Sequence, residues 1–333
     1  MVYNVHVFYF LEEKLMKKII AAAMLLVMVL ALVSCGGAAT TMTMGTGGPQ
    51  GTYYAYGGVL GTQIKTSAGI NVNVVSTDGS KANILGINVG NYQLGTVQSD
   101  VMAYAWEGSR SFEKEGALKS FRVIGGLYAE AVQLVTMNPD IKSVADLAGK
   151  KVSIGASGSG VYFNAIDVLA AAGLTEDDID PQYQSFGDSA DALKDGKIDA
   201  AFIVAGPPTP AITELFTTNT AYLVPIDGEI ADKLMKDCSY YTVHSIPANT
   251  YNGQTEEVKT VTVKATLIVS ASASEDEVYN ITKAIFDNID SITAAHAKGA
   301  ELSIENATSG MTAPFHAGAA KYFKEKGVEV ETE

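Results

Sequence analysis

Two glycine-rich stretches carry the residue types that could form a small-molecule site. The first, residues 45–54, reads Gly-Thr-Gly-Gly-Pro-Gln-Gly-Thr-Tyr-Tyr and follows a short apolar run. Glycine lets the backbone turn there and come close to a bound group, and tyrosine offers a flat wall with a hydroxyl. The alternative is a surface turn with two half-buried aromatic side chains. The ligand contacts expected from this stretch are Gly47, Gly48, Tyr53 and Tyr54.

The second stretch, residues 155–160, reads Gly-Ala-Ser-Gly-Ser-Gly between an expected strand and an expected helix. A helix N-terminus presents free N–H groups and about half a positive charge, so it can hold a carboxylate without a cationic side chain. The alternative is a flexible turn whose serines only cap the helix. The residues expected to bind a ligand carboxylate are Ser157, Gly158, Ser159 and Gly160.

Charged side chains near these stretches are few. The chain contains only two arginines, Arg110 and Arg122, and neither lies in a stretch assigned to the site. Backbone N–H groups must therefore take an anionic ligand group, a role that bidentate arginine often has. Glu130 and Asp100 lie near expected strand ends, where either could pair with a ligand ammonium. The alternative for both is a carboxylate that caps a helix or lies in a solvated turn.

Neutral polar side chains complete the candidate site. Gln98 and Gln133 are expected as hydrogen-bonding groups of its wall, although either could be a solvated strand residue. The run Pro-Pro-Thr-Pro at 207–210 is expected to form a rigid rim with some contact through Thr209, or else only a helix start. Two further candidate ligand contacts are Asn83 and Ser99.

Metal, cofactor and catalytic patterns are absent from the sequence. The four histidines are far apart, and neither glycine-rich stretch has the Lys-Ser/Thr ending of a phosphate loop or the pattern of a nucleophile elbow. We expect no metal, no cofactor and no enzymatic activity, with an exported hydrolase or transferase as the alternative. The net charge of −14 also disfavours nucleic acid as a partner.

The N-terminus has the pattern of an export signal. Two lysines at 17–18 precede an apolar run at 19–33, which is too short for a stable membrane span. Leu-Val-Ser-Cys at 32–35 resembles a bacterial lipobox, so we expect lipid on Cys35, removal of residues 1–34 and translation from Met16. The predicted location is extracytoplasmic, with the lipoprotein anchored to the cell membrane in a periplasm or on the outer face.

Short β-branched runs alternate with helical patterns along the rest of the chain, which predicts the α/β class with mainly parallel strands. The expected strands are 71–75, 92–97, 132–137, 151–154, 200–204 and 261–270. The expected helices are 57–67, 80–89, 160–172, 189–194 and 275–296.

A pattern that occurs twice in the sequence predicts two sheets that face one cleft. The helix at 80–89, a glycine and a strand that ends at 98–100 parallel the helix at 189–194, a glycine and a strand that ends at 205–207. Open α/β sheets bind ligands at the carboxyl ends of their strands. We expect the chain to leave the first lobe at Gly125-Gly126 and to return near 242–247. The expected parts are 35–125 and 244–333 for lobe 1, and 126–243 for lobe 2.

Two segments have a distinctive order of residues, Val-Ser-Thr-Asp-Gly-Ser at 75–80 and Gly-Thr-Val-Gln-Ser-Asp at 95–100. In these segments the chain resembles the TAXI group of extracytoplasmic solute-binding proteins, which serve tripartite ATP-independent periplasmic (TRAP) transporters. The segment at 141–154 is shared widely among two-lobed binding proteins and supports only the fold. The other matching segments are 44–54, 127–133, 154–160, 185–202, 206–210 and 246–251.

The resemblance implies a two-lobed, periplasmic-binding-protein-like fold of type II with the ligand cleft between the lobes. It implies capture of a small carboxylate or an amino acid such as glutamate or glutamine, and delivery to an ion-coupled TRAP-type permease. The alternative is a binding protein of an ABC importer or of a sensor kinase with the same fold.

Overall fold

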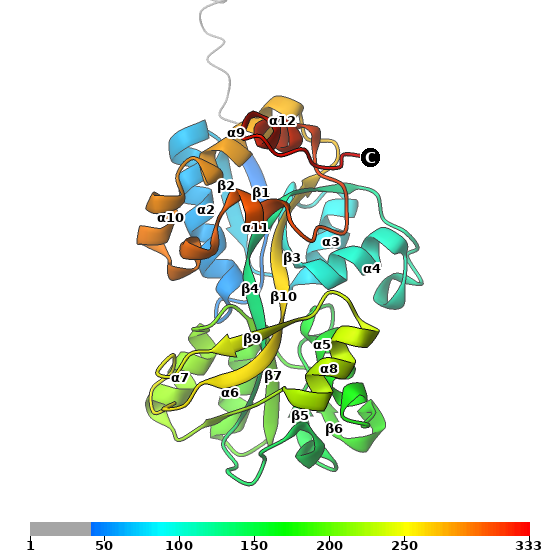
Figure 1. The fold of residues 1–333 in the computed structure, drawn as a ribbon, viewed down its shortest axis with the longest axis vertical. Coiled ribbons are helices and arrows are strands. Elements are labelled where there is room, and N and C mark those ends of the chain that lie inside the picture. The colour runs from blue at the N-terminus through cyan, green and yellow to red at the C-terminus, as the bar shows by residue number, and fades with distance from the viewer. Residues whose placement is uncertain (1–40) are drawn as a thin grey trace, which may run out of the picture. The chain divides into compact units, whose positions relative to one another are not determined.

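Two long neighbouring strands run through the middle of the fold and connect its two halves (Figure 1). The computed structural model describes residues 41–333, so the signal segment 1–34, the start at Met16 and the lipid site at Cys35 lie outside the described residues. Strands β4 (Phe121–Thr136) and β10 (Val258–Ser270) pair antiparallel along most of their length.

The other elements alternate between strand and helix, as expected for the α/β class. The remaining strands are β1 (Thr41–Gly45), β2 (Asn71–Val75), β3 (Leu94–Gln98), β5 (Lys151–Ser153), β6 (Asp180–Gln182), β7 (Ala200–Ala205), β8 (Tyr222–Val224) and β9 (Thr242–Ile246). The α-helices are α2 (Thr52–Ala68), α3 (Ser80–Asn88), α4 (Ser99–Glu107), α5 (Val161–Ala171), α6 (Phe186–Lys194), α7 (Pro210–Thr218), α8 (Gly228–Asp237), α9 (Glu275–Phe286), α10 (Ile289–Ala295), α11 (Ile304–Thr308) and α12 (Ala317–Glu325). Short 3₁₀ helices are η1 (Arg110–Phe112), η2 (Val144–Leu147), η3 (Glu176–Asp178) and η4 (Ala297–Glu301).

All strands belong to one continuous sheet rather than to the two separate sheets expected from the sequence. Its order is β2-β1-β3-β10-β4-β7-β5-β6, with β8 paired to β4 and β9 paired to β10. On one side of the central antiparallel pair, β1 is parallel to both β2 and β3. On the other side, β5 is parallel to both β6 and β7. Because β4 and β10 are long enough to serve both halves, the hydrogen-bond ladder passes from one half to the other.

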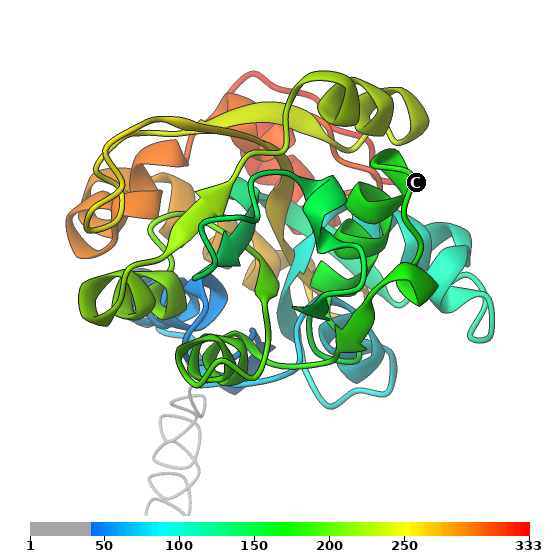
Figure 2. The ribbon, with the colours of Figure 1, turned by 90° about the horizontal axis from the view of Figure 1, so that it is seen from below.

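Helices cover both sides of the strands, as the view along the long axis shows (Figure 2). Every residue of β3 and of β7 is buried. Strands covered on both faces read as continuous apolar runs, and this explains the Ala-Ala-Phe-Ile-Val-Ala sequence of β7.

Buried apolar side chains form separate clusters in the two halves. One cluster draws on residues up to Tyr128 and from Ala265 onward, and two others lie between Ala131 and Val263. We therefore propose residues 41–128 and 265–333 as lobe 1, and residues 129–264 as lobe 2. The first crossing lies near the predicted Gly125-Gly126, and the second runs along β10. The segment 242–247 forms β9, which pairs with the lobe 2 end of β10.

Helix α2 begins at Thr52, five residues before the predicted start at Gly57, and it contains three glycines, of which Gly57 and Gly61 are in close contact with neighbouring strands. These glycines are packing positions: a Cβ on Gly57 would lie 2.8 Å from Thr46 Cγ2, and one on Gly61 would lie 3.3 Å from Val72 Cβ. The helix ends at Gly69, whose positive φ of 70° suits a glycine C-cap. As a result Tyr53 and Tyr54, expected in a turn, lie in the first turn of a helix.

The long helix expected at 275–296 is divided into α9 and α10. Helix α9 begins with a capping box between Ser274 and Glu277 and ends before Asp287. None of the helices between residues 41 and 333 is both long and apolar enough to cross a membrane.

Candidate ligand-binding site

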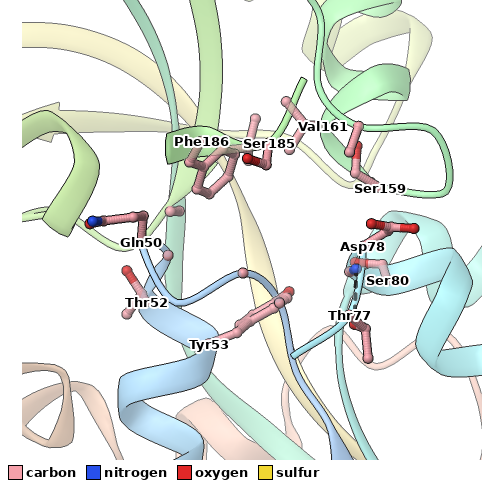
Figure 3. Close-up of a pocket in the computed structure, with 18 of the residues that line it drawn as sticks. Gln50, Thr52, Tyr53, Thr77, Asp78, Ser80, Ser159, Val161, Ser185 and Phe186 are labelled. Atoms are coloured by element: carbon pink, nitrogen blue, oxygen red, sulfur yellow. Dashed lines mark hydrogen bonds between the residues drawn. The ribbon is translucent and has the colours of Figure 1, made fainter. Parts of the chain in front are cut away.

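A cavity of about 370 Å³ lies between the lobes, and four helices begin at its wall. Helices α2 and α3 come from lobe 1, and α5 and α6 come from lobe 2. Figure 3 shows Thr52 and Tyr53 facing Ser185 and Phe186 across this space. The first residue of each of these helices lines the cavity, and so does the N-cap residue before it. The first residues are Thr52, Ser80, Val161 and Phe186, and the N-cap residues are Gly51, Gly79, Gly160 and Ser185.

The strand directions explain why these helices begin at one place. Helices α2, α3, α5 and α6 follow β1, β2, β5 and β6, and the carboxyl ends of parallel strands meet at one edge of a sheet. Gln98 at the end of β3 and Ala205 at the end of β7 also line the cavity. The two strands that end the repeated helix, glycine and strand pattern of the sequence thus reach the same site.

Loops of the two lobes touch each other around the cavity. Thr52 Oγ1 donates a hydrogen bond of 2.8 Å to the carbonyl of Gly206. The carbonyl of Gln50 accepts from Ala211 N at 3.2 Å, and the carbonyl of Gly158 accepts from Ala82 N at 3.3 Å. These contacts join lobe 1 to lobe 2, so the structure is a closed arrangement of the lobes.

Glu130 places a buried carboxyl group in the cavity wall. Tyr53 Oη donates to Glu130 Oε2 at 2.6 Å, and the Glu130 side chain is almost fully buried. Burial raises the pKa of Glu130 to about 8, since the hydrogen bond from Tyr53 and the charge of Lys298 only partly oppose it and the charge of Asp100 adds to it. Glu130 is thus largely neutral at pH 7 in this environment.

Gln98 and Ser159 each have a buried oxygen within the same wall. Gln98 Nε2 donates to Asn164 Oδ1 at 2.9 Å, whereas Gln98 Oε1 and Ser159 Oγ find no hydrogen-bond partner within residues 41–333. A Cβ on Gly160 would lie only 1.5 Å from Gln98 Oε1. Glycine at 160 therefore makes room for this acceptor.

No lysine, arginine or histidine lines this cavity in the described part of the chain. Arg110 forms an ion pair with Asp167 at 2.6 Å, and Arg122 donates to the carbonyls of Lys119 and Phe121. The favourable interactions for an anion are therefore the N–H groups and dipoles of the four helix N-termini.

The structure brings seven of the predicted residues together at the cavity. The predicted residues that line it are Gly47, Gly48, Tyr53, Gln98, Glu130, Ser159 and Gly160. The predicted residues that do not line it are Tyr54, Asn83, Ser99, Asp100, Gln133, Ser157, Gly158 and Thr209.

Several of the remaining candidates hold the backbone instead. Asn83 Nδ2 donates to the carbonyls of Thr46 and Thr96, which joins the ends of β1 and β3. Gln133 Nε2 donates to Thr209 Oγ1 at 3.0 Å in a buried network within lobe 2. Both networks support the loops that form the cavity wall.

The other candidates do not line the cavity. Tyr54 follows Tyr53 on α2, and so lies on another face of the helix, where it is 37% exposed. Ser157 is exposed, and Gly158 contributes its carbonyl to a contact between the lobes. Asp100 is buried and accepts from Asn164 Nδ2 at 3.0 Å, and Ser99 Oγ accepts from Lys264 N.

Sequence reasoning missed lining residues that follow β2, β6 and the first glycine-rich turn. The missed polar and aromatic lining residues include Gln50, Thr52, Ser76, Thr77, Asp78, Ser80, Gln184, Ser185 and Phe186. Their signal was the same as that of Gln98: polar residues directly after a strand and before a helix. Within residues 41–333 no group of three His, Cys, Asp or Glu side chains is arranged to hold a metal ion.

Comparison with known proteins identifies the family. The NMT1-like family matches residues 44–327. The chain belongs to the NMT1-like family. The resemblance to the TAXI group, and with it the TRAP-type permease as partner, is corrected by this match, because the segments on which it rested are individually short and weakly specific.

Solved structures similar to this NMT1-like chain have low sequence identity. A protein of Bordetella bronchiseptica RB50 is 17% identical, with a TM-score of 0.54 over 86% of this chain and 89% of that one. The periplasmic aliphatic sulphonate binding protein SsuA from Escherichia coli is 17% identical, with a TM-score of 0.44 over 87% and 91%. A putative L-cystine ABC transporter protein from Listeria monocytogenes is 18% identical, with a TM-score of 0.48 over 79% and 98%.

The predicted two-lobed, periplasmic-binding-protein-like α/β fold is confirmed by the sheet topology together with the similarity to the Bordetella bronchiseptica structure. Among the functional predictions, the family match contradicts the TAXI assignment, and the alternative, a binding protein of an ABC importer, is left as a proposal. Lipid attachment at Cys35 and membrane anchoring stay predictions.

Proposed function

We propose that this NMT1-like chain is an extracytoplasmic solute-binding protein that encloses one small carboxylate or amino acid and delivers it to a membrane importer. The observation that carries the proposal is the convergence of four helix N-termini, two from each lobe, on a cavity to which residues 41–333 contribute no basic side chain. Its volume of about 370 Å³ is within the range of small-ligand pockets, which is about 300–1,000 Å³.

The two ends of such a solute would find different partners. First-turn N–H groups have no acceptor within their own helix, so a ligand carboxylate can accept hydrogen bonds from them. The Glu130 carboxyl is an acceptor that suits an ammonium or another donor. An amino acid such as glutamate or glutamine satisfies both sets, whereas a 2-oxo acid satisfies only the first.

The importer that receives the solute is proposed to be of the ATP-driven class, or else a sensor with the same mode of binding. This was the alternative to the TRAP-type permease, and the family match leaves it as the working proposal. An ATPase gene beside the gene for this protein would support an importer. A neighbouring sensor kinase without an ATPase would favour the second role.

A thermal-shift screen of carboxylates, amino acids and 2-oxo acids tests the proposed ligand class. A ligand at 100 times its Kd stabilises the folded state by about 2.7 kcal/mol, which gives a clear rise in Tm. L-glutamate, L-glutamine and 2-oxoglutarate are the first compounds to compare. The bound compound should be recovered unchanged by mass spectrometry, since turnover would indicate an exported enzyme. A screen in which no carboxylate raises the Tm would contradict the proposal.

A further inference from the structure

The two lobes line the cavity with different kinds of side chain. The polar side chains that line it from lobe 1 are Gln50, Thr52, Tyr53, Ser76, Thr77, Asp78, Ser80 and Gln98. Lobe 2 adds the polar side chains of Glu130, Ser159, Gln184 and Ser185, and the apolar ones of Ala156, Val161, Phe186, Val204 and Ala205. A solute enclosed between the lobes therefore meets apolar surface mainly on the lobe 2 side.

Phe186 provides the largest apolar side chain of the lobe 2 wall. It is the first residue of α6, and it stays partly exposed although it packs against two apolar clusters of lobe 2. Figure 3 shows its ring on the lobe 2 side of the space, opposite Thr52 and Tyr53 of lobe 1. Because Phe186 lines the cavity and keeps exposed apolar surface, an apolar group of a bound solute gains free energy by covering it.

The Phe186 ring also lies close to the N-terminus of a lobe 1 helix. Its Cδ2 and Cε2 atoms are each 3.3 Å from the position that a Cβ on Gly51 would occupy. Gly51 is the N-cap residue of α2, one of the four helix N-termini proposed to bind a carboxylate. A solute group that covers the ring is therefore close to a carboxylate held at this N-terminus.

Val161 and Val204 extend the apolar surface from two neighbouring elements. Val161 is the first residue of α5, Val204 belongs to β7, and both are more than nine-tenths buried. Neither these side chains nor Phe186 can form a hydrogen bond with a solute, so a polar group placed against them loses water without gaining a partner. Residues 41–333 also contribute no basic side chain that could pair with a second carboxylate in the cavity.

We propose that Phe186, together with Val161 and Val204, forms an apolar subsite for an aliphatic or aromatic group of the solute. The preferred ligand is then an amino acid or carboxylate with an apolar body, rather than one with a polar side chain such as glutamate or glutamine. Phe186 is the main specificity-determining residue, because it is the largest and most exposed of the three. This inference rests on the proposed solute-binding function and narrows its ligand class.

The first measurement detects the subsite with benzyl alcohol, an uncharged apolar probe. Protein labelled with ¹³C-phenylalanine gives ring signals of Phe186 and Phe163, which are assigned by their loss in Phe186→Leu and Phe163→Leu. Phe163 is the matched control, since it is also a partly exposed phenylalanine of lobe 2 and contacts Tyr104 of lobe 1 with ring centroids 6.1 Å apart, but does not line the cavity. Titration should shift the Phe186 signal until it saturates and leave the Phe163 signal unchanged.

The second measurement is the ratio of the affinities for L-leucine and L-asparagine, whose side chains have nearly the same shape but differ in polarity. The parent protein should bind L-leucine at least about tenfold more tightly, because only its side chain gains by covering apolar surface. Phe186→Ala should reduce this preference by about fivefold or more, whereas Phe186→Leu should keep most of it and Phe163→Ala should not change it. Equal weakening of both ligands in Phe186→Ala would show that the ring only packs against Gly51, and would overturn the subsite.

The two measurements separate this inference from the proposed function. A saturable shift of Phe186 in benzyl alcohol supports the subsite even if no amino acid or carboxylate raises the Tm, and in that case the proposed ligand class is what fails. An unchanged Phe186 signal, or equal affinity for L-leucine and L-asparagine in the parent protein, overturns the subsite even if the protein binds amino acids.

Discussion

The acid–base behaviour of single residues in this protein is decided by burial. Glu130 and Asp100 are both buried, and burial is the largest cause of their raised pKa values, about 8 and about 7. Their nearest partners are a tyrosine hydroxyl and an asparagine amide rather than cations. A ligand ammonium placed beside Glu130 would favour its charged form, so we expect amino acid binding at pH 7 to release a proton.

The first prediction is that Glu130→Gln flattens the dependence of stability on pH. The pKa of Glu130 rises from 4.5 to about 8 on folding, so the folded protein holds the extra proton and its advantage is lost as pH rises through this window. Between about pH 5 and pH 7 one such group lowers the free energy of unfolding by up to ~1.4 kcal/mol per pH unit. Urea unfolding at several pH values measures this slope, and Glu229→Gln on the exposed face of α8 should leave it unchanged. An unchanged slope in Glu130→Gln would show that Glu130 is charged in the folded state.

The second prediction compares two glycines of the cavity wall. Gly160→Ala places a methyl group against Gln98 Oε1 and within 3.1 Å of Ser80 Oγ, whereas a Cβ on Gly48 meets nothing within 4 Å. The φ of −75° at Gly160 suits alanine, so the fold should survive. Titration calorimetry with the ligand found in the screen should show at least about tenfold weaker binding for Gly160→Ala. The added methyl group overpacks the cavity wall at a cost of about 1–3 kcal/mol, and we expect this cost to reduce the free energy of ligand binding. Equal binding by Gly160→Ala and Gly48→Ala would contradict the cavity geometry.

At the scale of elements, the site consists of helix beginnings rather than of charged side chains. Helices α2, α3, α5 and α6 contain between 9 and 17 residues, which is enough for each N-terminus to carry a partial positive charge. Only α6 has a side-chain N-cap, Ser185, whose Oγ accepts from Asp188 N at 3.2 Å. The N-cap positions of the other three are glycines, which have no side chain to accept from the first N–H groups of their helices.

The third prediction separates a cap at the cavity from a cap far from it. Ser185→Ala and Ser274→Ala each remove a serine N-cap, so each should lower the free energy of unfolding by about 1 kcal/mol. Ser185 lines the cavity and Ser274 does not. Only Ser185→Ala should therefore weaken ligand binding as well, which chemical denaturation and calorimetry on the two variants can measure. Equal ligand affinity in both variants would show that the N-terminus of α6 does not contribute to ligand binding.

At the scale of the whole binding unit, residues 41–333, the lobes are joined by a hinge of two strands and by contacts around the cavity. The contact with the strongest geometry is the ion pair of Arg110 in lobe 1 with Asp167 in lobe 2, which is bidentate. Arg110 also has a positive φ of 50°, a backbone strain that its side-chain contacts must offset. Opening the lobes would break this pair and expose both groups to water.

The fourth prediction is that Arg110→Gln shifts the protein toward an open arrangement. Small-angle scattering should give a larger radius of gyration for this variant than for the parent protein, and saturating ligand should reverse the difference. Lys283→Gln is the control, since it breaks the ion pair of Lys283 with Asp287 inside lobe 1. No compaction of Arg110→Gln on adding ligand would contradict closure of the lobes on the solute.

Much of the fold and about half of the candidate site could be predicted from local patterns. Strand β7 is visible as a buried apolar run, and Gln98 and Glu130 were recognised as polar residues in or beside such strands. Tyr54 does not line the cavity, because α2 begins earlier than the sequence pattern predicts and helical periodicity sends neighbouring tyrosines to different faces. Asp100 follows the same strand as Gln98 but is part of α4 and does not line the cavity.

By itself, the sequence determined the α/β class, the alternation of strands with helices and the presence of only two arginines in the chain, whereas the crossing between lobes near Gly125-Gly126 stays a prediction. These are properties of periodicity, composition and chain order, which act over a few residues. Only the tertiary structure decided that four helices begin at one cavity and that Asn83, Gln133 and Asp100 support its wall. The physical reason is that strand order and register bring together residues far apart in the chain, and burial then decides which polar groups find partners and which face the ligand.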